Sequence, residues 1–211
     1  MRFTALSVAA AAIVLTQTAH ATDPESLNVQ GIELGMSLDD TRTELVGRGY
    51  EKTIGNEPAA FEDIVKKARD EITGPVPKGG LMRFETRTEI VILLFVALPD
   101  GPEVTSITYR LNDPSVSYAD LSGTTIDLYG KPDFKRTSLG FTPDNLPRLY
   151  WLASPPDAAH GAPGGAFLEL AYSKSSGESE FHSGQITLQD GGARQKQQTS
   201  EIEDGVRKAS R

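Results

Sequence analysis

The chain has 211 residues, a formal net charge of −8 at pH 7 and no cysteine. A negative surface repels phosphate backbones, so no nucleic-acid partner is expected. The lack of cysteine excludes disulfides and a cysteine-linked lipid, so an apolar core must provide the stability. The length suits one larger domain or two small units packed together.

Residues 1–21 have the three parts of a secretory signal peptide. Arg2 gives a positive start, residues 3–15 are almost wholly apolar, and Ala19-His20-Ala21 has the small residues that precede a cleavage site. We therefore predict cleavage between Ala21 and Thr22. The alternative is an apolar helix that belongs to the fold. The apolar run is shorter than the about 20 residues needed to cross a bilayer, so we expect a soluble mature protein without a membrane anchor.

Two helices are predicted in the first half of the chain. Ser37 stands at the start of the first helix, where its hydroxyl can accept a hydrogen bond from a backbone N–H of the first turn. Asp39 and Asp40 lie in that turn, at the positive end of the helix dipole. This helix is expected to end at residues 47–49, where glycine tolerates a positive φ. Residues 61–72 carry apolar side chains at helical spacing and pairs of opposite charge on the other side, which predicts a second helix.

Three strands are predicted after these helices. Residues 81–88 alternate between apolar and polar side chains, as a strand with one covered face does. Residues 90–98 are continuously apolar and predict a central strand covered on both faces. Residues 105–111 alternate again, and the short turn before them predicts an antiparallel hairpin with the central strand.

The pattern of helix and strands then starts again. Ser117 precedes Asp120 at the spacing of a capping box, and Gly130-Lys131-Pro132 predicts the end of this helix. Strand-like runs follow at residues 134–141, 148–152, 166–172 and 184–188.

These elements predict an α+β fold. We expect two related modules of helix plus antiparallel sheet, residues 22–113 and 114–190, packed as one body. Residues 191–211 contain few apolar side chains and are expected to form a disordered tail or a frayed helix.

Two motifs resemble a known group of exported bacterial proteins. Gly31-Ile32-Glu33-Leu34-Gly35-Met36-Ser37 leads into a helix that ends at Gly49-Tyr50, and Leu128-Tyr129-Gly130-Lys131-Pro132-Asp133 ends the later helix. Both are similar to modules of the β-lactamase-inhibitor-protein-like superfamily, which includes the BamE lipoprotein family of outer-membrane assembly. The resemblance implies two helices and an antiparallel sheet in each module, and binding of protein partners without catalysis. The chain lacks the cysteines of these relatives, so we carry over the fold only.

The sequence contains no motif of a known catalytic or metal site. After cleavage only His160 and His182 would remain, and neither has the spacing of a zinc ligand. Glu180 and His182 could bind a metal weakly, but alternation along a strand explains the pair equally well. No nucleophile elbow or phosphate-binding loop is present, while a serine triad from distant residues stays open. We expect neither a cofactor nor a metal.

Tyr150 and Trp151 are the candidate binding residues. Because they are neighbours in a predicted strand, their side chains must point to opposite faces of the sheet. One would belong to the core and the other could be an exposed anchor, since Trp and Tyr are enriched in binding hot spots. The alternative is that both are covered.

These observations favour an exported, non-enzymatic protein that binds another envelope protein through a sheet face. The expected location is the periplasm of a Gram-negative cell, with release to the medium as the alternative. The alternative function is a periplasmic hydrolase whose acid and base residues are dispersed along the chain.

Overall fold

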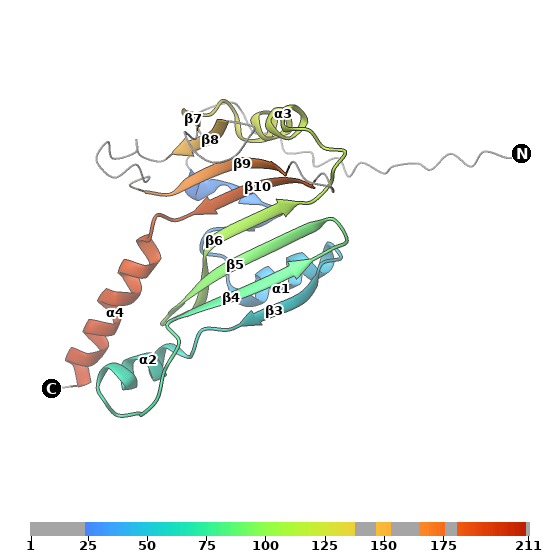
Figure 1. Ribbon diagram of the computed structural model, residues 1–211. Helices are drawn as coiled ribbons and strands as arrows, with labels where there is room; N and C mark the ends of the chain where they lie inside the picture. The colour runs from blue at the N-terminus through green and yellow to red at the C-terminus, as the bar shows by residue number, and fades with distance from the viewer. Residues whose placement is uncertain (1–23, 138–146, 153–164, 176–180, 210–211) are drawn as a thin grey trace, which may run out of the picture.

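The computed structural model describes residues 24–137, 147–152, 165–175 and 181–209. These residues form the predicted α+β fold (Figure 1). The strands of the main sheet are β3 (Glu51–Asn56), β4 (Gly79–Glu85), β5 (Glu89–Leu98), β6 (Gly101–Leu111), β7 (Phe134–Thr137), β8 (Pro147–Leu152), β9 (Phe167–Ser175) and β10 (Phe181–Gln189). The other elements are a short 3₁₀ turn (Pro24–Ser26), β1 (Asn28–Val29), β2 (Ile32–Glu33), α1 (Leu38–Gly47), α2 (Phe61–Ala68), α3 (Tyr118–Tyr129) and α4 (Ala193–Ala209).

The eight strands of the main sheet follow the order β3-β4-β5-β6-β10-β9-β8-β7, and β1 pairs separately with β2. Every neighbouring pair in the main sheet is antiparallel. The first half of the chain gives α1 and the strands β3 to β6, and the second half gives α3 and the strands β7 to β10. The last strands of the two halves, β6 and β10, pair at the centre, so the two modules share one sheet and pack as one body.

Both predicted serine caps are present. The hydroxyl of Ser37 accepts the N–H of Asp40 at 3.2 Å, and the hydroxyl of Ser117 accepts the N–H of Asp120 at 3.2 Å. The carboxylate of Asp120 in turn accepts the N–H of Ser117 at 3.2 Å, which completes a capping box. The positions at which α1 and α3 begin are therefore confirmed.

The second predicted helix is shorter than expected and ends at Ala68. Asp70 adopts a left-handed conformation with a φ of 57°. The N–H of Glu71 then bonds to the carbonyl of Lys66 at 2.9 Å, and the N–H of Asp70 bonds to the carbonyl of Lys67 at 3.1 Å. This pair of bonds is a Schellman cap, which usually takes glycine at the left-handed position. The apolar spacing continued to Ile72, but the cap ends the helix before it.

One face of the sheet carries the core. The side chains of α1, α3 and the β1–β2 pair pack on it together with inward-facing residues of the strands. The prediction that residues 90–98 are covered on both faces is wrong for the first part of β5. Val91 and Leu93 are fully buried, whereas the alternating positions Ile90, Ile92 and Leu94 face away from the core, and Leu94 is 40% exposed. No described helix lies across the middle of this second face (Figure 1).

Of the two alternatives expected for residues 191–211, a disordered tail is wrong for residues 193–209, which form the helix α4. Its two buried side chains are Gln198 and Ile202. Ile202 packs with Ile64 of α2 and Ala97 of β5 in a small second core. The amide of Gln198 donates to the carbonyls of Lys78 at 2.9 Å and Ala97 at 2.8 Å. α2 and α4 thus pack together at one end of the sheet (Figure 1).

Candidate functional site: the outer face of the sheet

The face of the sheet that points away from the core is here called the outer face. The strand registers place one residue of each strand in a continuous row across it. From the β3 edge to the β7 edge this row reads Ile54, Arg83, Ile92, Thr108, Thr187, Glu169, Tyr150 and Phe134. Apolar and aromatic residues therefore lie toward both ends of the row, with threonines at its centre.

Exposed apolar side chains are concentrated on the outer face. Among the described residues, five large hydrophobic side chains are exposed, and four of them are on this face: Ile54, Leu81, Leu94 and Phe134. The solvent-facing side of an antiparallel sheet normally carries polar residues. Ile54, Leu81 and Leu94 lie on the neighbouring strands β3, β4 and β5, whereas Phe134 lies at the opposite edge of the sheet. Apolar side chains that adjoin on an exposed face are typical of an interaction site.

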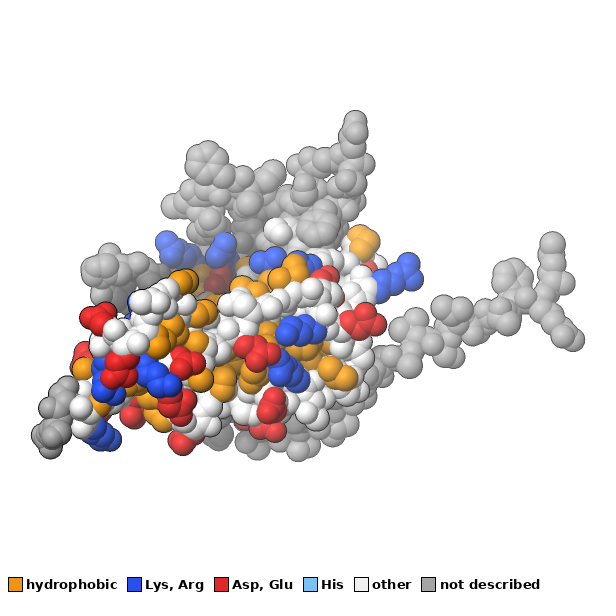
Figure 2. Space-filling model, turned by 90° about the horizontal axis from the view of Figure 1, so that it is seen from below, with side chains coloured by type: hydrophobic (Ala, Val, Ile, Leu, Met, Phe, Trp, Pro, Cys, Tyr) orange, Lys and Arg blue, Asp and Glu red, His pale blue; other side chains and the backbone are white. Residues whose placement is uncertain are grey.

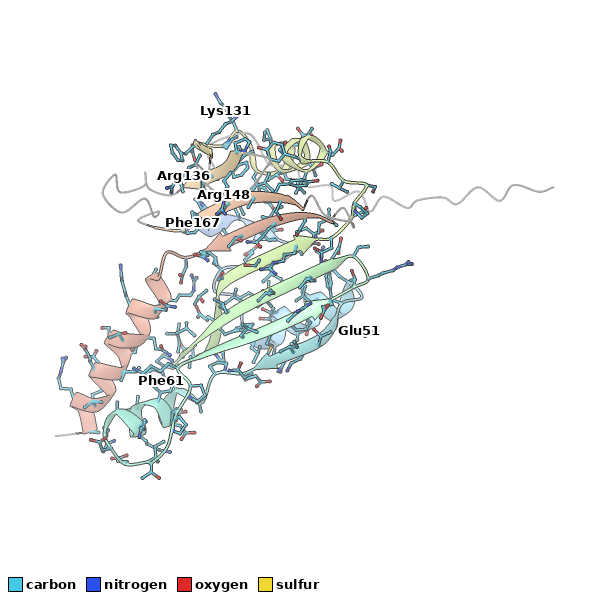
Figure 3. The ribbon with its side chains drawn as sticks, viewed as in Figure 1. Glu51, Phe61, Lys131, Arg136, Arg148 and Phe167 are labelled. Atoms are coloured by element: carbon cyan, nitrogen blue, oxygen red, sulfur yellow. The ribbon has the colours of Figure 1, made fainter. Side chains whose placement is uncertain are left out.

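The β7–β8 end of the outer face has an aromatic pair. Phe134 is 42% exposed and lies directly opposite Tyr150 across the two strands. The centroids of the two rings are 6.2 Å apart, within the range of interacting aromatic pairs. Phe167, half-buried at the start of β9, belongs to the next row of the same face and is marked in Figure 3. This end of the sheet therefore offers rigid aromatic surface.

Tyr150 and Trp151 point to opposite faces, as predicted. Trp151 is 2% exposed, donates its indole Nε1–H to the carbonyl of Gly130 at 2.9 Å, and lies edge-on to Tyr129. It belongs to the core. Tyr150 is the half-buried member on the outer face, and its role in binding stays a prediction.

A carboxylate joins the aromatic pair to a basic residue. Glu169 accepts from Arg148 at 2.8 Å and from the hydroxyl of Tyr150 at 3.3 Å. Burial, and then the charge of Glu169, raises the pKa of Tyr150, so its phenol stays neutral and keeps its hydrogen.

Basic residues gather at the same end of the molecule, where Figure 3 marks Lys131, Arg136 and Arg148. Arg136 and Arg148 are both exposed and lie directly opposite each other in the β7–β8 register. Like charges in this position destabilise a sheet. By contrast, positive and negative side chains are interspersed on the side of the molecule seen in Figure 2. The β7–β8 end thus carries three marked basic side chains, of which Arg148 is paired with Glu169.

Several predicted positions lie outside the described residues. They are the signal peptide with its cleavage site at Ala21 and Thr22, His160, Glu180 and residues 138–141 of a predicted strand. His182 lies in β10, where its backbone is opposite Lys174. Within the described ranges, no three His, Asp or Glu residues are grouped so that they could bind a metal ion. In the same ranges, no helix has both the length and the apolar composition needed to cross a membrane.

The sequence analysis named Tyr150 but missed its partners on the outer face. Phe134, Arg148 and Glu169 come from three strands, and only the registers of β7, β8 and β9 bring them together. Alternation along each predicted strand could have indicated which side chains share a face, but not which residues are opposite each other. Comparisons of the chain with protein-family models, with curated proteins and with solved structures gave no match.

Proposed function

We propose that the protein is an exported, non-enzymatic binding protein that holds another envelope protein against its outer face. The observation that carries this proposal is that Ile54, Leu81, Leu94 and Phe134 are all exposed on that one face. Covering apolar surface is favourable by roughly 25 cal/mol per Å², so a partner that packs on this face gains stability from each of these side chains.

The β7–β8 end of the outer face favours a partner that presents an apolar side chain next to a carboxylate. Phe134 and Tyr150 provide a firm apolar contact, and Arg136 and Arg148 stand beside them. Guanidinium groups bind carboxylates through two parallel hydrogen bonds. A partner segment with an apolar side chain next to Asp or Glu would satisfy both features. Since the chain as a whole is negative, it would repel an acidic partner elsewhere and direct it to this end.

The experiment is affinity capture from an envelope extract, followed by identification of the partner and direct measurement of its affinity for purified variants. Phe134→Ser and Tyr150→Ala should each weaken the complex by about 2 kcal/mol or more if they are its anchors. Val46→Ser is the matched control, because Val46 is the most exposed large hydrophobic residue, at 61%, and lies on α1 away from the outer face.

The proposal is wrong if the identified partner binds the Phe134 and Tyr150 variants as tightly as it binds the Val46 variant. A loss of function caused instead by His182→Ala in a folded protein would favour the hydrolase alternative. Export is tested separately, by cell fractionation and the intact mass of the exported form. A mass that still includes residues 1–21 would contradict cleavage before Thr22.

A further inference from the structure

A cavity of about 560 Å³ lies on the core side of the sheet, between α3, the β1–β2 pair and the strands β6 and β10. Small-molecule sites in proteins usually have volumes of roughly 300–1,000 Å³. The cavity is partly open to solvent, and it lies on the opposite side of the sheet from the outer face.

The cavity has an apolar wall built from segments that are far apart in the sequence. Leu27 and Val29 come from the start of the described chain, Leu121 and Leu128 from α3, and Ile186 from β10. Of these, Leu27, Val29, Leu121 and Ile186 are each at most 7% exposed, so their positions are fixed by the core around them. The wall is thus largely pre-formed and suits an apolar molecule.

Three hydroxyl groups of the described lining, those of Tyr109, Tyr129 and Thr125, donate their hydrogens within the protein. Tyr109 donates to Glu89 at 3.0 Å, Tyr129 donates to the carbonyl of Asn28 at 2.8 Å, and Thr125 donates at 2.7 Å to the carbonyl four residues earlier in its helix. Burial raises the pKa of Tyr129 to about 12, so its phenol remains neutral. A ligand deep in the cavity would therefore meet hydroxyl groups whose hydrogens already have acceptors, and the exposed Thr124 hydroxyl lies at the opening.

Arg48 and Asp120 are the charged residues among the described part of the lining, and both are paired within the protein. The Nε of Arg48 donates to Glu44 at 2.7 Å, and the carboxylate of Asp120 accepts the capping bonds of Ser117. The two charges have opposite sign, so the described lining residues carry no excess charge to attract an anion or a cation. Charged ligands would lose hydration without a compensating partner.

From the volume, the apolar wall and these internal pairings, we propose that the cavity binds an uncharged, largely apolar small molecule such as a neutral lipid or a long-chain alcohol. The binding energy comes from apolar surface removed from water. The cavity and the outer face lie on opposite sides of the sheet. This activity therefore does not depend on the proposed capture of a protein partner.

The proposal is tested with N-phenyl-1-naphthylamine, an uncharged fluorescent probe that brightens in apolar surroundings, titrated into the purified chain. Thr124 lines the cavity but is itself exposed on α3, so Thr124→Trp places an indole at the opening without disturbing the core. Thr43→Trp is the matched control. Thr43 is exposed on α1 outside the lining and, like Thr125, donates to the carbonyl four residues earlier.

One saturable site is expected, and Thr124→Trp should weaken it about tenfold or more, which corresponds to about 1.4 kcal/mol of binding energy per factor of ten. Thr43→Trp should leave the affinity unchanged. Leu94→Gln, which removes apolar surface from the outer face, should also leave it unchanged. Non-saturating fluorescence, or equal affinity in the Thr124 and Thr43 variants, would overturn the proposal. Circular dichroism verifies the fold, and Thr124→Phe replaces the Trp variant if the latter is unfolded.

The charge of the ligand is tested by competition among molecules with the same alkyl chain. Decanol, decanoate and decylammonium are each used to displace the probe, and decanol should act at the lowest concentration. If decanoate or decylammonium displaces the probe more effectively, a charged group is recognised and the assignment to uncharged ligands is wrong.

Discussion

The indole of Trp151 donates its Nε1–H to the backbone carbonyl of Gly130 at 2.9 Å, which joins β8 to the residue that ends α3. Removing the ring would leave a cavity and take a hydrogen-bond donor away from the carbonyl of Gly130. Trp151→Ala should therefore lower the free energy of unfolding by about 3–5 kcal/mol, as measured by chemical denaturation.

Tyr150→Ala is the matched comparison, because the neighbouring side chain points to the outer face and is half-buried. Its hydroxyl bond to Glu169 is long, at 3.3 Å, so the expected loss is clearly smaller than that of Trp151→Ala. Equal losses would mean that the outer face is covered at this position.

The opposite orientation of this pair could be predicted from the sequence, because side chains alternate along any strand. β3 could not, since all six of its residues are exposed and give no apolar pattern. It is a strand because its backbone pairs with β4. The grouping of residues on the outer face could not be predicted from the sequence either. Phe134 and Tyr150 are opposite each other because of the β7–β8 register, which the alternation along each strand does not determine.

The serine caps should contribute similar amounts to stability. Ser37→Ala and Ser117→Ala each remove a side-chain acceptor from the first turn of a helix, at a cost of roughly 0.5–2 kcal/mol. Aspartate or asparagine at the same positions should restore most of the loss, because these residues cap equally well. Chemical denaturation measures the change. If both alanine variants kept full stability, the caps would not be the features that start these helices.

One buried polar side chain contributes to the docking of α4, beside the apolar contact of Ile202. Gln198 donates to the carbonyls of Lys78 and Ala97, and Gln198→Ala would leave both without this donor. The expected loss of unfolding free energy is about 1–3 kcal/mol. Gln197→Ala is the control, because the neighbouring glutamine is exposed. Hydrogen exchange of the α4 amides should increase in the first variant only, and equal exchange in both would argue against docking through Gln198.

The composition of α4 did not predict that this segment is an ordered helix. Residues 193–209 have a strongly polar sequence, which is why disorder was expected there. Yet Gln198 and Ile202 are four residues apart and lie on one side of the helix, where they contact the end of the sheet. Two buried positions are too few to produce an apolar stripe in the sequence.

Stability should fall at alkaline pH because of buried tyrosines. Burial raises the pKa of Tyr129 to about 12, and burial together with Glu89 raises the pKa of Tyr50 and Tyr109. In the unfolded chain a tyrosine ionises near pH 10. Between about pH 10 and pH 12 the unfolded state therefore binds fewer protons than the folded state, and stability decreases as pH rises.

Each such tyrosine lowers the free energy of unfolding by up to about 1.4 kcal/mol for each pH unit within that window. Below the window the free energy of unfolding does not change with the ionisation of these groups. Denaturation midpoints measured across the window test this slope. Tyr129→Phe removes one ionising group and should make the slope shallower. A stability that is constant over the window would show that these phenols ionise in the folded state as easily as in the unfolded one.

Because β6 pairs with β10 at the centre of the sheet, β6 remains an unpaired edge strand during part of the synthesis of the chain. β6 ends at Leu111 and β10 begins at Phe181, so a growing chain completes the first half long before the partner of its last strand has been synthesised. Until then β6 has one row of unpaired amides and carbonyls, which can pair with a strand of another molecule. A chain that stops before Phe181 would keep this edge permanently, and it should self-associate.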